Sequence, residues 1–141
     1  MKRLRVLIAD DHPILAESLS SLFAADERFV VVGWARNGEK AVEMAESLEP
    51  DVVLMDLEMP VMDGLEATRR ITRQAATRVL MFSGSDLPAN AARARLAGAW
   101  GYLPKHVHGP DLVAAVLAAG WTATRARATA RRSVRPPAAP A

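Results

Sequence analysis

Polar residues able to carry phosphate or metal chemistry recur where apolar runs of this sequence end. Asp10 and Asp11 follow the run LRVLIA, Asp56 follows VVLM, Ser83 follows RVLMF, and Lys105 comes soon after WGYL. Three carboxylates held close together repel one another, so at neutral pH they take up a proton or bind a cation. Oxygen ligands suit Mg²⁺, and an ammonium group with a hydroxyl completes a site for a tetrahedral anion. Brought together, this set supports phosphoryl transfer to a carboxylate.

The stretch 52–64, VVLMDLEMPVMDG, indicates how such an acid is positioned. Its apolar, β-branched start is typical of a strand covered on both faces, and Pro60 with Gly64 supplies turn chemistry afterwards. Asp56 then lies at the carboxyl end of the strand, the edge where ligands gather in parallel α/β sheets. Taken alone, the same stretch also fits an Asp56 that only caps the following turn.

Strand-like runs alternate with helical patterns along the chain. The runs cover residues 4–9, 29–34, 52–55, 78–82 and 100–103, and helical spacing follows in 13–23, 39–49, 65–73, 88–97 and 111–120. Gly98 and Gly120 are expected to end the last two helices. The alternation predicts an α/β fold of one domain, a flavodoxin-like (βα)5 doubly wound parallel sheet with strand order 2-1-3-4-5, which aligns the strand ends at one edge.

Composition divides the chain into two parts. With 141 residues, 50% of them hydrophobic, one ordinary core is expected over residues 1–120. Residues 121–141 form a tail or linker rich in Arg, Ala and Pro, predicted to be disordered beyond the end of the last helix. Removing the five arginines of this tail from 18 basic residues leaves 13 against 16 acids, so residues 1–120 carry a net charge of about −3. The basic character therefore belongs to the tail, which is more often a solvated linker than a nucleic-acid contact.

The composition also bears on location. The absence of cysteine excludes disulfides and thiolate metal sites. No apolar run is long enough for a signal peptide or a membrane span, so we expect a cytoplasmic protein without a membrane partner.

Four motifs resemble the receiver domain of two-component response regulators. They are ADDHP at 9–13, LMDLEMPVMDG at 54–64, FSG at 82–84 and GAWGYLPK at 98–105, and the resemblance covers about residues 3–120. ADDHP and the last helix are most similar to the subfamily with a helix-turn-helix output of the nitrate-regulator or quorum-regulator type. The residues after 120 are too few and too polar for that output domain, so DNA binding is expected only through a domain not present here.

The resemblance implies that Asp56 accepts a phosphoryl group from a sensor histidine kinase. It also implies that Mg²⁺, or Mn²⁺, binds to Asp11, Asp56 and the backbone carbonyl of Glu58, with Asp10 acting mostly through water. Lys105 is then expected to pair with the phosphoryl group.

Further roles implied by the resemblance concern the response to phosphorylation. Ser83 is expected to bind the phosphate and move toward it while Tyr102, the only tyrosine, changes rotamer. Glu58 and Ser85 occupy positions that tune dephosphorylation. Homodimerisation is a possible output. His12 is expected to shape its loop or face solvent.

Two other functions compete with this phosphorylation-dependent switch. One is a degenerate receiver that is never phosphorylated and acts by constitutive protein binding. The other is a phosphatase of the haloacid-dehalogenase type, which needs a second Asp two residues after its nucleophile, where this chain has Glu58, and an acid pair after the nucleophile rather than before it. We therefore expect a regulator rather than an enzyme, with at most self-catalysed phosphotransfer and autodephosphorylation.

Overall fold

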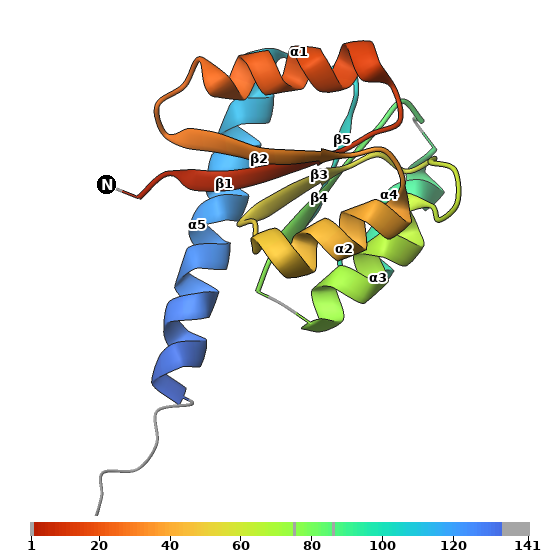
Figure 1. Ribbon diagram of the computed structural model, residues 1–141. Coiled ribbons are helices and arrows are strands. Elements are labelled where there is room, and N and C mark those ends of the chain that lie inside the picture. The colour runs from red at the N-terminus through yellow and green to blue at the C-terminus, as the bar shows by residue number, and fades with distance from the viewer. Residues whose placement is uncertain (1, 75, 86, 134–141) are drawn as a thin grey trace, which may run out of the picture.

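The computed structural model describes residues 2–74, 76–85 and 87–133. Within these ranges, five strands alternate with five helices (Figure 1). In chain order the elements are β1 (Leu4–Ala9), α1 (Pro13–Ala24), β2 (Phe29–Ala35), α2 (Gly38–Leu48), β3 (Val52–Met55), α3 (Gly64–Gln74), β4 (Arg78–Ser83), α4 (Pro88–Leu96), β5 (Gly101–Pro104) and α5 (Gly109–Ser133). The predicted alternation of strands and helices is confirmed.

The strands form one parallel sheet in the order β2-β1-β3-β4-β5, so the predicted flavodoxin-like topology is confirmed. Its register aligns the strand ends, with Ala9 paired to Met55, Met55 to Met81, and Ser83 to Pro104. The residues that follow β1, β3, β4 and β5 therefore emerge at the same edge of the sheet.

Helices cover both faces of the sheet, which explains why β3 reads as a continuous apolar run. Val53 and Met55 pack in the core beneath α2, α3 and α4, whereas Val52 and Leu54 pack in the core beneath α1 and α5. All four are buried, because neighbouring residues of a strand point to opposite faces. Burying each such side chain contributes about 1.5–3 kcal/mol to stability. Figure 1 shows α1 and α5 on one side of the sheet and the other helices on the opposite side.

The prediction that Gly120 ends the last helix is wrong, because α5 continues to Ser133. A Cβ atom at Gly120 would lie 2.7 Å from Cδ1 of Leu4, so the glycine permits close packing of α5 on β1. The Ala and Arg residues that follow are good helix formers. Gly98, in contrast, has φ of +104° just after α4 and ends that helix as predicted. Despite the length of α5, no helix in the described ranges is long and apolar enough to cross a membrane.

Arg127 holds the extension of α5 against the edge of the sheet where the strands begin. Its guanidinium pairs with the buried carboxylate of Asp51 and donates a hydrogen bond of 2.6 Å to the carbonyl oxygen of Pro50. The other oxygen of Asp51 accepts a 2.8 Å hydrogen bond from the backbone N–H of Arg5, so α5 is tied to the starts of β1 and β3. The end of the predicted disordered tail, residues 134–141, lies outside the described residues.

Candidate functional site

Asp10 and Asp56 are fixed by the sheet itself. The backbone N–H of Asp10 donates to the carbonyl oxygen of Ala35 at 3.0 Å, and that of Asp56 donates to the carbonyl oxygen of Ala9 at 2.9 Å. These bonds extend the parallel ladder by one residue past β1 and β3. Asp10 is 1% exposed and Asp56 is 5% exposed, so both carboxylates are held rigidly at the bottom of the site.

A tight loop returns the chain from Asp56 to α3. The N–H of Gly64 donates to the carbonyl oxygen of Leu57 at 2.8 Å, and a Cβ atom at Gly64 would overlap the carbonyl oxygen of Asp56. Glycine is therefore required at this position, as the turn chemistry of the sequence suggests. Val61, at the exposed tip of the same loop, has φ of +71°, an uncommon conformation for a β-branched residue.

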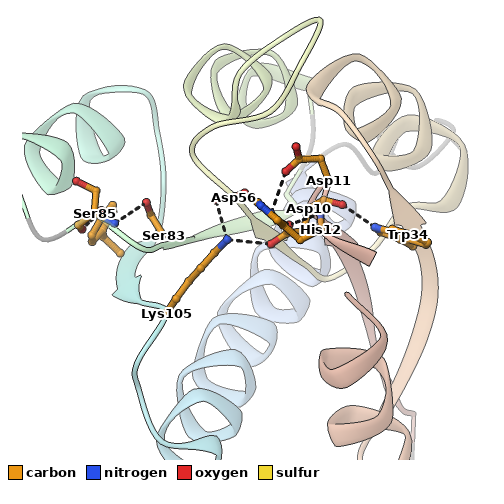
Figure 2. A network of polar contacts seen from close by, with 9 residues as sticks. Asp10, Asp11, His12, Trp34, Asp56, Ser83, Ser85 and Lys105 are labelled. Carbon is orange, nitrogen blue, oxygen red and sulfur yellow. Dashed lines mark hydrogen bonds and ion pairs between the residues drawn. The ribbon is translucent and has the colours of Figure 1, made fainter. Parts of the chain in front are cut away.

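Lys105 forms ion pairs with both buried acids, Asp10 and Asp56. Its Nζ atom lies 3.2 Å from Oδ2 of Asp10 and 3.2 Å from Oδ1 of Asp56 (Figure 2). The backbone N–H of Lys105 donates to the carbonyl oxygen of Ser83 at 2.9 Å, which sets the position of the lysine after β5. One ammonium group thus partly neutralises two carboxylates that the sheet has brought together.

The surroundings of Asp56 shift the pKa of its carboxyl above the usual value. Burial raises the pKa of the Asp56 carboxyl, and the negative charge of Asp10 raises this pKa further. Lys105 and the backbone N–H of Leu57 lower the pKa, but not enough to reverse the shift. Asp56 therefore gains from any additional cation that binds beside it.

His12 contacts the same carboxylates as Lys105, but through their other oxygens. Its Nδ1 atom lies 3.0 Å from Oδ1 of Asp10, 3.1 Å from Oδ1 of Asp11 and 4.0 Å from Oδ2 of Asp56. The expectation that His12 only shapes the loop or faces solvent therefore missed an inward contact, although 66% of its side chain is exposed. On β2, the indole N–H of Trp34 donates to the carbonyl oxygen of Asp10 at 2.7 Å, a contact that the sequence analysis did not predict.

The donor set fits a divalent cation. Candidate ligand atoms of Asp10, Asp11, His12 and Asp56 all lie within 4.8 Å of one another. Oδ1 of Asp11 is buried and accepts no hydrogen bond from the residues that the structure describes, so its lone pairs are available to a metal. Carboxylate oxygens are the ligands that Mg²⁺ and Mn²⁺ prefer.

An open cleft of about 660 Å³ lies over these groups. Asp11, Asp56 and Lys105 line it, and so do the predicted site residues Glu58, Ser83 and Ser85. The cleft has room for a tetrahedral anion beside Asp56. Of the site residues singled out in the sequence, Asp10 and Tyr102 do not line it.

Tyr102 instead contacts the loop after β4. Its hydroxyl donates a 2.7 Å hydrogen bond to the carbonyl oxygen of Ser85. The N–H of Ser85 in turn donates to Oγ of Ser83 at 3.2 Å, and Oγ of Ser85 accepts a 2.7 Å hydrogen bond from the side chain of Asn90 on α4. Hydrogen bonds thus connect the rim of the cleft, at Ser83, to both β5 and α4.

Comparisons with known proteins relate most of this chain to one family. The family described as "Response regulator receiver domain" matches residues 6–117. The nitrate/nitrite response regulator protein NarL of Escherichia coli K12 is 39% identical over 112 residues, which make up 79% of this chain and 52% of NarL. The protein-glutamate methylesterase/protein-glutamine glutaminase 2 of Photobacterium profundum is 45% identical over 105 residues, 72% of this chain and 26% of that protein. The chain thus spans from about a quarter to about half of these curated relatives.

Among solved structures, the response regulator domain of Thermotoga maritima CheB is similar, with a TM-score of 0.79 and 32% sequence identity. The match covers 84% of this chain and 97% of that domain. The family match, over residues 6–117, includes the whole candidate site.

Proposed function

The chain belongs to the response regulator receiver domain family, and from this premise we propose that it is a phosphorylation-dependent switch of a two-component system, with Asp56 as the phosphoacceptor. The observation that carries the proposal is the contact of Lys105 with both Asp10 and Asp56 at 3.2 Å, inside a cleft with room for a phosphoryl group. A buried acid paired with a lysine at the carboxyl end of a parallel sheet is suited to this role.

In the proposed reaction, a carboxylate oxygen of Asp56 attacks the phosphorus of a phosphohistidine on the sensor kinase. A new O–P bond forms as the N–P bond breaks, and the imidazole of the kinase leaves with the electron pair of that bond. Lys105 lies where its charge would stabilise the phosphoryl oxygens. Hydrolysis of the acyl phosphate would restore Asp56, so the chain acts as a regulator and not as an enzyme on other substrates.

Mg²⁺, or Mn²⁺, would be held by Asp11, Asp56 and the backbone carbonyl of Glu58, with Asp10 close by. When bound, the ion neutralises the negative charge of the transferred group. The buried oxygen of Asp11, which accepts no hydrogen bond from the described residues, and the raised pKa of Asp56 both support a cation at this position.

The conformational change would spread from the site through the loop after β4. A phosphoryl group adds nearly two negative charges beside Ser83, which we propose turns toward it. Because Ser83 is linked through Ser85 to Tyr102 and to α4, its movement would shift the balance between two arrangements of this face. Glu58 and Ser85, which line the cleft, would tune the rate of dephosphorylation.

The proposed partners follow from the family. They are a sensor histidine kinase, a possible second copy of the chain, and DNA only through an output domain outside this sequence. We propose residues 1–120 as the receiver and 121–141 as a linker whose first part extends α5, in a cytoplasmic protein.

The test is intact mass spectrometry after incubation with Mg²⁺ and a small acyl phosphate. We expect one phosphoryl adduct on the wild-type protein and none on Asp56→Asn. If neither protein gained an adduct, we would reject the switch in favour of a receiver that acts by constitutive binding. Steady hydrolysis of ordinary phosphomonoesters would instead favour a phosphatase.

A further inference from the structure

We propose that His12 is a ligand of the metal site and that its imidazole makes the site prefer cations that accept nitrogen, such as Co²⁺, Ni²⁺ or Zn²⁺, over Mg²⁺. This inference rests on the proposed function, because it assumes that a divalent cation binds beside Asp56. It goes beyond that function by identifying a nitrogen donor among the ligands.

The oxygens of the buried acids are divided between two sides. Lys105 contacts Oδ2 of Asp10 and Oδ1 of Asp56. The remaining oxygen of each acid, together with Oδ1 of Asp11, faces His12. Ligand atoms of these residues lie within 4.8 Å of one another, and Nδ1 of His12 is hydrogen-bonded to Oδ1 of Asp10, a contact that a bound cation would replace.

The distances among these atoms match an octahedral ion. For bonds of about 2.1 Å, adjacent ligands lie about 3.0 Å apart and opposite ligands about 4.2 Å apart. Nδ1 of His12 lies 3.0 Å from the oxygen of Asp10 and 3.1 Å from that of Asp11, which are spacings of adjacent ligands. Its distance of 4.0 Å from Oδ2 of Asp56 is close to that of opposite ligands.

The backbone around His12 holds the imidazole in this position. His12 is the N-cap residue of α1, yet its side chain makes no capping hydrogen bond, so the ring is not needed to begin the helix. Its backbone N–H donates to Oδ1 of Asp10 at 2.8 Å, which fixes the residue against the acids. Because 66% of the side chain is exposed, Nε2 can hold the ring proton in water when a cation displaces the Nδ1–Asp10 hydrogen bond and takes the lone pair of Nδ1.

An imidazole ligand changes which cation the site binds best. Oxygen-only sites suit Mg²⁺, whereas sites that include nitrogen bind first-row transition metals with affinities that rise from Mn²⁺ through Co²⁺ to Ni²⁺. The loss of a direct ligand lowers affinity by at least the factor of about ten that is typical of supporting residues. Removing the imidazole should therefore weaken Co²⁺ binding while leaving Mg²⁺ binding largely intact.

Titration calorimetry with CoCl₂ and MgCl₂ at one fixed pH tests this selectivity. The informative variant is His12→Asn, because the amide can keep a hydrogen bond to Asp10 but offers no imidazole. We expect it to bind Co²⁺ about tenfold or more weakly than wild type, with Mg²⁺ affinity changed by less than about threefold. His106→Ala, which removes an exposed histidine outside the cluster, is the matched control and should change neither affinity.

Unchanged Co²⁺ binding in His12→Asn, or an equal loss for both metals, would show that His12 only orders the loop. A wild-type protein that binds neither metal would overturn the proposed metal site itself. Nitrogen-detected NMR of the wild-type imidazoles with ZnCl₂ is independent of any variant. A large shift of Nδ1 of His12, without one at His106 or His108, is expected, and its absence would overturn the inference.

Discussion

The ammonium nitrogen of Lys105 lies 3.2 Å from Oδ1 of Asp56, and this contact offsets part of the cost of burying the carboxylate. Burial and the charge of Asp10 raise the pKa of Asp56, whereas Lys105 lowers it. Lys105 therefore has two roles in the proposed site. It keeps more of Asp56 ionised at a given pH, and it places a positive charge beside the incoming phosphoryl group.

Lys105→Met should raise the pKa of Asp56 further above its usual value, because the two acids lose their shared cation. A smaller fraction of Asp56 is then ionised at any pH near that pKa, and the rate of phosphorylation by an acyl phosphate should fall by about tenfold or more. Carbon NMR of labelled Asp carboxyls measures the pKa. Lys40→Met, which changes an exposed lysine of α2, should leave both quantities unchanged. An unaltered Asp56 titration in Lys105→Met would contradict this role.

Gly64→Ala should destabilise the protein by about 1–3 kcal/mol, because the new methyl group would overlap the carbonyl oxygen of Asp56. Gly84→Ala is the matched control. The nearest atom to a Cβ at Gly84 is Cδ of Lys105 at 4.0 Å, so this variant should lose little stability. Urea unfolding measures both free energies. Equal stability of the two variants would mean that the loop after β3 adapts to a side chain at position 64.

The fold could be predicted because its signals are local. Apolar runs, turn residues and helical spacing identify the strands and helices to within a few residues, except for the end of α5, and a parallel sheet then aligns the strand ends. The course of α5 depends on contacts between residues far apart in the sequence. Gly120 lies against Leu4, where a side chain would not fit. Arg127 pairs with Asp51, 76 residues away. Sequence spacing reveals neither contact.

The same distinction between local signals and long-range contacts applies to the site. Residue type and position at a strand end indicate that Asp10, Asp56 and Lys105 lie together, because backbone pairing fixes where they emerge. The direction of a side chain in a loop has no such constraint. The ring of His12, in the loop between β1 and α1, turns inward. The indole of Trp34 reaches from β2 to the carbonyl oxygen of Asp10, a contact with a backbone atom that residue types do not indicate. The chemical roles of these residues stay predictions.

Tyr102→Phe should loosen the loop after β4, since it removes the hydrogen bond to the carbonyl oxygen of Ser85. One such bond contributes about 1 kcal/mol, which corresponds to about fivefold faster exchange of the amide hydrogens in this loop. Hydrogen exchange followed by NMR measures the change at Ser85 and Leu87, with the amides of β3 as an internal control. Unchanged exchange at Ser85 and Leu87 would mean that the tyrosine does not hold the loop.

Arg127→Ala should lower the free energy of unfolding by about 1–3 kcal/mol, because it leaves the buried carboxylate of Asp51 without its cation. Arg125→Ala removes an exposed arginine two residues earlier on α5 and should change stability by less than about 0.5 kcal/mol. Urea unfolding of both variants makes the comparison. A loss of stability as large in Arg125→Ala would indicate a general effect of helix charge rather than anchoring by Arg127.

The identity of the phosphorylated residue is the most direct test of the proposed function. After treatment with Mg²⁺ and an acyl phosphate, borohydride reduces an aspartyl phosphate to homoserine, which peptide mapping locates. We predict homoserine at position 56 in the wild-type protein and in Asp63→Asn, a variant with the same substitution later in the same loop, and none in Asp56→Asn. Homoserine at position 10 or 11, or at no position, would contradict the assignment of Asp56 as the phosphoacceptor.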